Sequence, residues 1–235
     1  AFGRLEARSE LERWLVWGGY PSIITTSDIE LREKLMGELV GSYLYRDILE
    51  LDSVRHPAKI VDLLRLLAYQ IGQEVSLSEL SSNLAINRAT VERYLDLLEK
   101  VFVIYRVNGF SRNLRKEVTK NSRYYFFDNG VRNSLINNFN PLSLRNDIGQ
   151  LWENYLMIER QKTNHYQRRS VNTYFWRTYD QKEIDCIEER AGSLFGFEFK
   201  WRGDMRKATR REFSVVYPQS VLKTITPDNF EEFLL

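Results

Sequence analysis

The sequence predicts a mixed α/β (α+β) protein, in which a helical winged helix-turn-helix module precedes an α/β unit. Apolar residues recur at helical spacing over roughly the first hundred positions. Two short apolar and aromatic stretches follow the last of these helices, in the order that a winged helix-turn-helix requires. In the last part of the chain, helical and strand-like stretches alternate around a hairpin signal, which is typical of an α/β unit.

Residues 1–55 are expected to form a helical segment. A capping-box pattern opens a first helix over 9–17, and a Gly-Gly-Tyr-Pro sequence ends it. Apolar residues near 3.6-residue spacing predict a second helix over 28–51. Arg46 and Asp47 lie within that helix, where a local surface ion pair is the simplest interpretation.

Residues 56–135 have the element order of a winged helix-turn-helix. Capping residues mark the starts of the second and third helices, and the third helix buries one apolar face. The expected elements are helices over 58–71, 77–84 and 88–100 and strands over 101–107 and 124–127. A helix-turn-helix of this kind can bind DNA or another protein, so its partner has to be judged from its charges.

Basic residues in this module make DNA a candidate partner. Arg88 and Arg93 lie on the exposed side of the third helix, where acidic residues oppose them. The presumed wing is more strongly basic, and Arg112, Arg115 and Lys116 are its candidate phosphate contacts. A solvated charged face or a protein contact would use the same residues, so the sequence leaves both readings open.

Residues 145–235 are expected to form the α/β unit. An amphipathic helix opens it, and an aromatic strand and a hairpin follow. The expected elements are a helix over 149–159, strands over 173–176, 183–188 and 194–201, a basic helix over 202–212, a strand over 220–226 and a helix over 228–235.

The candidate catalytic residues lie mainly in the hairpin. If its turn is centred on Ala191 and Gly192, residues whose numbers sum to 383 face each other, which places Asp185 opposite Glu198. Because side chains alternate along a strand, Glu183, Asp185, Glu198 and Lys200 are expected on one face. The other face is expected to be apolar, with Ile184, Cys186, Phe197, Phe199 and Trp201.

Two facing carboxylates indicate a site for Mg²⁺. Magnesium takes one or two carboxylates together with water and substrate phosphate, and Asp185 and Glu198 supply such a pair. The main-chain carbonyl of Phe199 could add an oxygen, and Lys200 could orient or deprotonate an attacking water. The preceding helix offers a further carboxylate, Glu153 or, as the second choice, Glu159.

These residues resemble a known pattern. Glu153, Asp185 and the Glu198-x-Lys200 pair are similar to the PD-(D/E)XK nuclease superfamily, which implies a restriction-endonuclease-like fold and a Mg²⁺-dependent phosphodiesterase site. Ile184 stands where that family carries proline. The whole chain also resembles the C-terminal part of prokaryotic P-loop ATPases of the AAA type, through the stretches 14–21, 45–48, 90–95, 126–133, 152–154, 176–178, 183–185 and 198–200.

The second resemblance implies that residues 1–55 are a lid-side segment of an ATPase whose core is missing. No G-x-x-x-x-G-K-[ST] phosphate loop occurs in the sequence, so ATP is expected only in the missing N-terminal region and this chain should not hydrolyse it. Expected partners are DNA and the missing ATPase core, and the sequence leaves an oligomer open.

Composition fits these expectations. The 235 residues include 43% hydrophobic residues, which is enough for real cores, and the net charge of +2 gives no general polycation argument for nucleic acid. The single cysteine, Cys186, fits a reducing compartment. The sequence lacks an apolar run that could span a bilayer and starts with neither Met nor an apolar leader, so we expect a fragment of a cytoplasmic protein with no membrane partner.

Three hypotheses remain at this point. The chain could be a metal-dependent nuclease or nucleic-acid effector attached to an ATPase. It could be a regulatory interaction module of that ATPase, with apolar patches around residues 1–50. It could also be a non-catalytic DNA-binding segment that uses the wing and the basic helix over 202–211.

Overall fold

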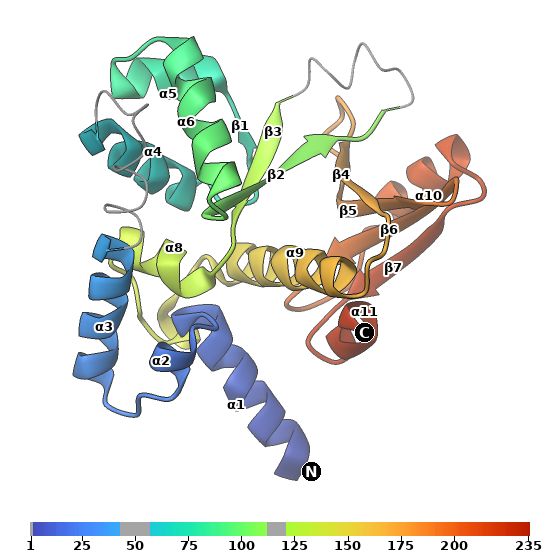
Figure 1. Cartoon of the computed structure of the whole chain (residues 1–235). Helices are drawn as coiled ribbons and strands as arrows, with labels where there is room; N and C mark the ends of the chain where they lie inside the picture. The colour runs from blue at the N-terminus through green and yellow to red at the C-terminus, as the bar shows by residue number, and fades with distance from the viewer. Residues whose placement is uncertain (1, 43–56, 112–120) are drawn as a thin grey trace. The chain divides into compact units, whose positions relative to one another are not determined.

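A computed structural model describes residues 2–42, 57–111 and 121–235 (Figure 1). The described residues form a mixed α/β structure with ten α-helices and a seven-stranded mixed sheet. The chain divides into two compact units, the first comprising Ala1–Arg106 and Tyr124–Asp147 and the second Val107–Arg123 and Ile148–Leu235. The strands are hydrogen-bonded in the order β1-β3-β2-β4-β5-β6-β7, and β2 and β3 each contribute residues to both units.

The first unit is mainly helical. Its described elements are α1 (Phe2–Trp17), α2 (Pro21–Ile24), α3 (Ile29–Ser42), α4 (Pro57–Tyr69), β1 (Glu74–Val75), α5 (Leu77–Leu84), α6 (Arg88–Lys100), α8 (Asn129–Leu135) and the short 3-10 helix η2 (Leu142–Leu144). The helix expected over 28–51 is described as far as Ser42, and Arg46 and Asp47 lie outside the described residues.

The helix starts of α5 and α6 confirm the capping signals. The Ser76 hydroxyl accepts a hydrogen bond from the Glu79 N–H at 3.3 Å, and the Asn87 side chain accepts one from the Thr90 N–H at 2.8 Å. The strand expected over 101–107 begins later, because β2 spans Ile104–Gly109. Phe102 has a φ of +57° and the Val103 N–H donates to the Leu98 carbonyl, so these residues close α6 instead.

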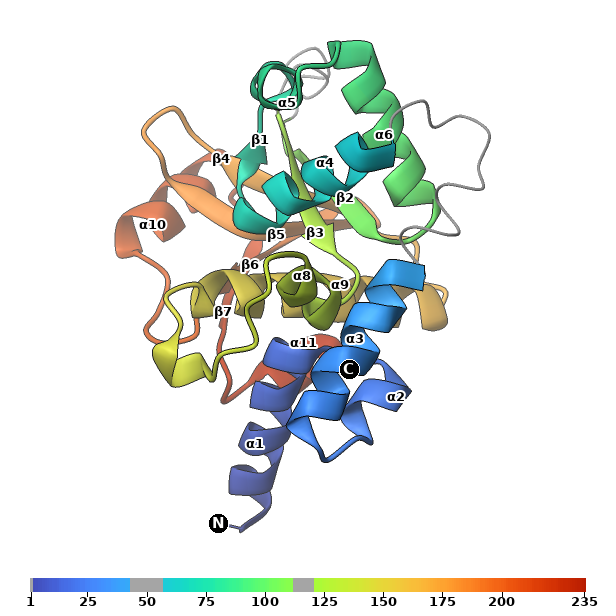
Figure 2. The same cartoon turned by 90° about the vertical axis from the view of Figure 1, so that its left-hand side faces the viewer.

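Helix α8, which the sequence analysis did not identify, packs against α1, α3 and α4 (Figure 2). Asp128 starts it, because one carboxylate oxygen accepts from the Val131 N–H at 3.0 Å. The other oxygen accepts from the Gly19 N–H at 2.7 Å, just after α1 ends. A Cβ atom at Gly130 would lie 2.1 Å from the Trp17 carbonyl oxygen, so glycine permits this close approach of α8 and α1.

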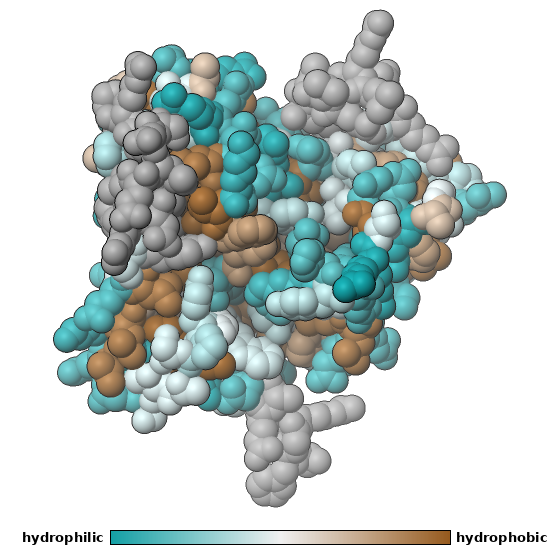
Figure 3. Space-filling model, viewed as in Figure 1, coloured by the Kyte–Doolittle hydropathy of each residue, from teal (hydrophilic) through white to brown (hydrophobic). Residues whose placement is uncertain are grey.

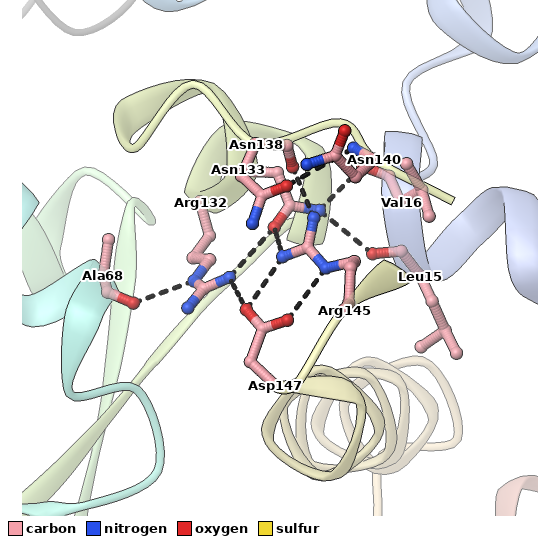
Figure 4. Close-up of polar contacts among 9 residues, drawn as sticks. All are labelled: Leu15, Val16, Ala68, Arg132, Asn133, Asn138, Asn140, Arg145 and Asp147. Carbon is pink, nitrogen blue, oxygen red and sulfur yellow. Dashed lines mark hydrogen bonds and ion pairs between the residues drawn. The ribbon is translucent and has the colours of Figure 1, made fainter. Parts of the chain in front are cut away.

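A buried polar network stabilises the end of the first unit (Figure 4). Arg145 Nε and Nη2 both donate to Asp147 at 2.8 Å, and Arg132 Nη1 donates to the same carboxylate at 2.5 Å. Asn133 connects this group to α1 by donating to the Val16 carbonyl at 2.7 Å. Because its buried charges are paired and hydrogen-bonded, we interpret the network as structural.

The second unit is the α/β part. Its elements are the end of β2, the start of β3 (Ser122–Phe126), α9 (Ile148–Tyr166), β4 (Asn172–Arg177), β5 (Glu183–Arg190), β6 (Ser193–Phe199), α10 (Lys207–Val216), β7 (Val221–Ile225) and α11 (Phe230–Leu234). β4, β5 and β6 are antiparallel, whereas the pairs β2–β4 and β6–β7 are parallel. The basic helix expected over 202–212 begins at Lys207 instead, after a turn in which Gly203 has a φ of +91°.

The sheet of the second unit is covered on both faces. Phe213 of α10 packs on Trp176 with ring centroids 5.0 Å apart. On the other face, Phe197 and Phe199 of β6 pack on Phe233 of α11 with ring centroids 4.7 and 5.4 Å apart. Figure 1 shows α9 on the same side of the sheet as α11.

One residue of the hairpin lies on a different face from the expected one. Ile184 is fully buried, but it belongs to the α10-side cluster with Trp176, Ile187 and Phe213 and does not share the face of Phe197. The β4–β5 register shifts between Tyr174 and Trp176. A bulge of this kind inserts a residue and reverses the alternation of side chains, which explains the difference.

None of the helices in the three described ranges has both the length and the apolar composition needed to cross a membrane.

Candidate functional site

The β5–β6 hairpin has the predicted turn and register. Ala191 and Gly192 have φ angles of +47° and +78°, as a two-residue hairpin turn requires. The register runs from Arg190 opposite Ser193 to Cys186 opposite Phe197. Beyond this pair, Asp185 precedes Cys186 and Glu198 follows Phe197, and the two strands remain in contact because the Asp185 carboxylate accepts from the Phe199 N–H.

Asp185 is almost completely buried, with 5% of its surface exposed. Its Oδ2 accepts a hydrogen bond from the Phe199 N–H at 2.8 Å. Burial raises the pKa of Asp185, although this hydrogen bond and the charges of Lys200 and Arg123 act in the opposite direction. The fold therefore holds a carboxylate here at a free-energy cost.

Glu198 is buried to the same extent as Asp185. Its Oε1 is 2.7 Å from Lys200 Nζ, whereas its Oε2 is buried and has no hydrogen-bond partner among the residues that the structure describes. Burial and then the charge of Asp185 raise the pKa of Glu198 to about 7, and Lys200 opposes this rise. A buried carboxylate oxygen without a donor is unusual, and it needs an explanation.

Arg123, at the start of β3, also belongs to the site, although the sequence analysis did not single it out. Its guanidinium lies 4.5 Å from the centre of the Phe175 ring. It is 2.7 Å from Glu183, 3.4 Å from Glu153 and 3.8 Å from Asp185. One feature of the sequence could have indicated this role. A single cation stands at the start of an aromatic strand, and a cation that is buried there requires acidic partners.

Lys200 is a cation in this arrangement. Burial acts to lower the pKa of Lys200, but the hydrogen bond to Glu198 and the nearby carboxylates outweigh it and raise the pKa. A protonated amine can hold a water molecule or a phosphate oxygen, but it cannot accept a proton. Of the two roles that the sequence suggested for Lys200, its positive charge therefore fits orientation.

The site has an excess of negative charge when all its groups are ionised. Four carboxylates (Glu153, Glu183, Asp185, Glu198) meet two cations (Arg123, Lys200), which leaves a charge of −2. This excess matches one divalent cation. In the described ranges, no group of three or more His, Cys, Asp or Glu side chains is arranged to hold a metal ion. A metal here would therefore depend on two carboxylates, a main-chain carbonyl and water.

The other candidate residues lie apart from this group. Glu159, the second choice on α9, pairs with Lys162 at 2.7 Å at the surface. Arg88 and Arg93 are exposed on α6, where Arg88 pairs with Glu92 at 3.1 Å and Arg93 lies 5.6 Å from the Tyr94 ring. Arg112, Arg115 and Lys116 lie outside the described residues.

Two family models match the chain, and both describe domains of unknown function. The model of a domain of unknown function, DUF8612, matches residues 8–142, and that of a second domain of unknown function, DUF4143, matches residues 148–227. The second match contains Glu153, Asp185, Glu198 and Lys200. No solved structure matches the chain.

Curated relatives are also uncharacterised. The chain is 27% identical over 195 residues to the uncharacterized protein Rv2008c of Mycobacterium tuberculosis, covering 82% of this chain and 43% of that protein. It is 28% identical to an uncharacterized protein of Haemophilus influenzae (79% and 44% covered) and 22% identical to MJ1544 of Methanocaldococcus jannaschii (78% and 40% covered). The chain thus spans about two-fifths of the length of these relatives. Because the DUF8612 model covers more than half of the chain, the protein belongs to that family.

Proposed function

We propose that the second unit is a nuclease-like domain that binds Mg²⁺ or Mn²⁺ through Asp185 and Glu198 and hydrolyses phosphodiesters. The observation that carries the proposal is the buried Oε2 of Glu198, which has no donor among the described residues and lies beside a second buried carboxylate. A divalent cation would stabilise both carboxylates, because it supplies the positive charge that two buried carboxylates need as a partner.

The residues around this pair have roles that suit phosphodiester hydrolysis. When bound, the cation would supply charge that stabilises the reacting phosphate. The Phe199 N–H fixes Oδ2 of Asp185, and Oδ1, which lies 3.8 Å from Arg123 Nη1, is the oxygen that would act as a ligand. Lys200 is positioned to hold the attacking water or a phosphate oxygen. Arg123 pairs with Glu153 and Glu183 and balances part of their charge.

For the whole protein, we propose a part of a prokaryotic AAA-type ATPase, in which the nuclease-like domain follows a winged helix. The capped helices α5 and α6 and the strands β2 and β3 support the winged-helix assignment, since they follow one another in the required order. ATP would bind only in a part of the protein that this chain lacks.

A regulatory interaction module is the second candidate. Ile29 and Leu31 on α3 are 62% and 48% exposed, and Figure 3 shows hydrophobic residues at the surface in the region of α2 and α3. Exposed apolar side chains on one helix can form part of a protein interface. This alternative predicts that the chain binds a separately produced ATPase core, and that Ile29→Glu and Leu31→Glu abolish this binding while Mn²⁺ binding persists.

Cleavage tests the first candidate directly. The purified chain is incubated with Mn²⁺ and with single-stranded, double-stranded and branched DNA and with RNA. We expect cleavage by the unmodified chain and by the control Glu159→Gln, and none by Asp185→Asn or Glu198→Gln purified in parallel. If no substrate is cleaved in the presence of Mn²⁺, the catalytic proposal is wrong.

A further inference from the structure

A cavity of about 410 Å³ lies in the second unit between α9, α11, β6 and β7. Its apolar wall includes Phe195, Phe197, Val221 and Phe233. None of Glu153, Asp185, Glu198 and Lys200 lines it. Side chains alternate along β6, so Phe195 and Phe197 point to the face opposite that of Glu198. The cavity is therefore separate from the carboxylate site.

Four cations surround the cavity, and one of them, Arg160, already has protein partners for its hydrogen-bond donors. Arg160 is buried on α9 and donates two hydrogen bonds to Glu188, at 2.8 and 3.0 Å. Asn164 donates a third hydrogen bond to the same carboxylate at 2.9 Å. Arg160 is thereby fixed in place, and Glu188 is largely satisfied. We expect Arg160 to shape the cavity and not to bind a ligand directly.

Three further cations line the cavity. Arg190 Nη2 is 3.2 Å from Glu188, and its Nε is enclosed by protein atoms without a hydrogen-bond partner in the described part of the chain, so Arg190 contributes its charge to the cavity and not its Nε donor. Its guanidinium lies 4.1 Å from the centre of the Phe195 ring, which forms part of the wall. Arg169 donates one hydrogen bond to the Leu235 main-chain oxygen, at 3.1 Å. Lys223 is exposed on β7.

The charge around the cavity is positive. The lining cations are Arg160, Arg169, Arg190 and Lys223, and the carboxylates are Glu232 in the lining and Glu188 behind it. Counted over these side chains alone, four positive and two negative charges leave an excess of +2. A phosphate monoester carries close to two negative charges near pH 7, whereas a carboxylate carries one. Guanidinium groups also match the geometry of phosphate oxygens.

We infer that this cavity is a binding site for a phosphate monoester on a flat, apolar body of about nucleoside size. Arg169 and Lys223 would hold the phosphate, Arg190 would add positive charge, and Phe195 and Val221 would contact the body. A bare phosphate ion would leave most of the volume to water, since a cavity of this size is typical of sites for small organic ligands. A free nucleotide and the 5′-phosphate end of a nucleic-acid strand both present a phosphate monoester on such a body.

Calorimetry with the unmodified chain in EDTA tests the inference. The probes are adenosine monophosphate, a 5′-phosphorylated dinucleotide, inorganic phosphate and adenosine. We expect adenosine monophosphate or the phosphorylated dinucleotide to bind, and the stronger of the two identifies the natural source. Inorganic phosphate and adenosine should each bind at least about tenfold more weakly, because the first lacks the contacts of the apolar body and the second lacks those of the phosphate.

Variants separate this site from the carboxylates. Lys223→Met and Arg169→Met should each weaken binding about tenfold, the usual loss of one charge-assisted hydrogen bond. Arg206→Met, which removes an exposed arginine outside the cavity, and Asp185→Asn should leave the affinity unchanged. The inference is overturned if neither phosphorylated probe binds at millimolar concentration, if both cavity variants bind like the unmodified chain, or if Asp185→Asn abolishes binding. Because EDTA is present, binding here is independent of whether the chain cleaves phosphodiesters.

Discussion

Replacing Glu198 with glutamine should stabilise the metal-free protein at neutral pH. The pKa of Glu198 is raised from 4.5 to about 7, chiefly by burial and then by the charge of Asp185. Between these two values the folded state retains a proton that the unfolded state has lost. The free energy of unfolding therefore falls as the pH rises through this window. Glutamine keeps the shape of the side chain and removes the titration.

The size of the effect follows from the shift. A change from 4.5 to about 7 corresponds to roughly 3 kcal/mol of lost stability once the pH exceeds the folded pKa. Glu198→Gln should match the unmodified protein near pH 4 and exceed its stability by up to this amount at pH 8. Asp185 interacts with Glu198, so the two carboxylates titrate together and the transition should be broad.

Urea unfolding in EDTA between pH 4 and pH 8 measures this difference. The matched control is Glu159→Gln, since Glu159 is a carboxylate on the same unit that pairs with Lys162 at the surface. The control should follow the unmodified protein at every pH. Parallel stability curves for Glu198→Gln and the unmodified protein would show that Glu198 is not held in an unfavourable ionised state, and the reasoning would be refuted.

Three further predictions concern charges and caps. Arg123→Met should destabilise the protein by roughly 3 kcal/mol or more in urea unfolding at pH 7, because buried carboxylates lose their cation; a loss below about 1 kcal/mol would contradict this. Asp128→Ala should cost about 1–2 kcal/mol through loss of the α8 cap, measured in the same way, whereas Asp128→Asn should cost less. Burial acts to raise the pKa of Asp147, but the hydrogen bonds from Arg145 and Arg132 outweigh it and lower the pKa. The stability that this carboxylate contributes is therefore present above about pH 4 and lost as the pH falls further, and acid titration of Asp147→Asn should lack that part of the transition.

Local signals predicted the parts of the fold that depend on neighbouring residues. The hairpin register followed from the turn at Ala191 and Gly192, because a two-residue turn determines which residues face each other. The starts of α5 and α6 followed from Ser76 and Asn87, whose side chains bind main-chain groups only three residues away. Interactions of this range can be read from a single sequence.

Contacts between distant residues were not predictable in the same way. Arg123 reaches Glu183 across 60 positions, and no local pattern indicates which acidic residues a strand cation will meet. The bulge in the β4–β5 pairing moved Ile184 to the other face, because one additional residue reverses the alternation. Asp128 combines both cases, because its cap on the Val131 N–H is local and readable from the sequence, whereas its contact with the Gly19 N–H, 109 residues away, is not.

The most direct test of the proposed metal site is a crystal of the chain soaked in Mn²⁺. Anomalous scattering identifies the ion and locates it without reference to activity. The account predicts one anomalous peak between Asp185 and Glu198, within about 2.0–2.6 Å of a carboxylate oxygen of each, and no peak there in crystals of Glu198→Gln. A fully soaked crystal with no anomalous density at this position, and with Glu198 Oε2 bonded to water or to a protein donor, would contradict it.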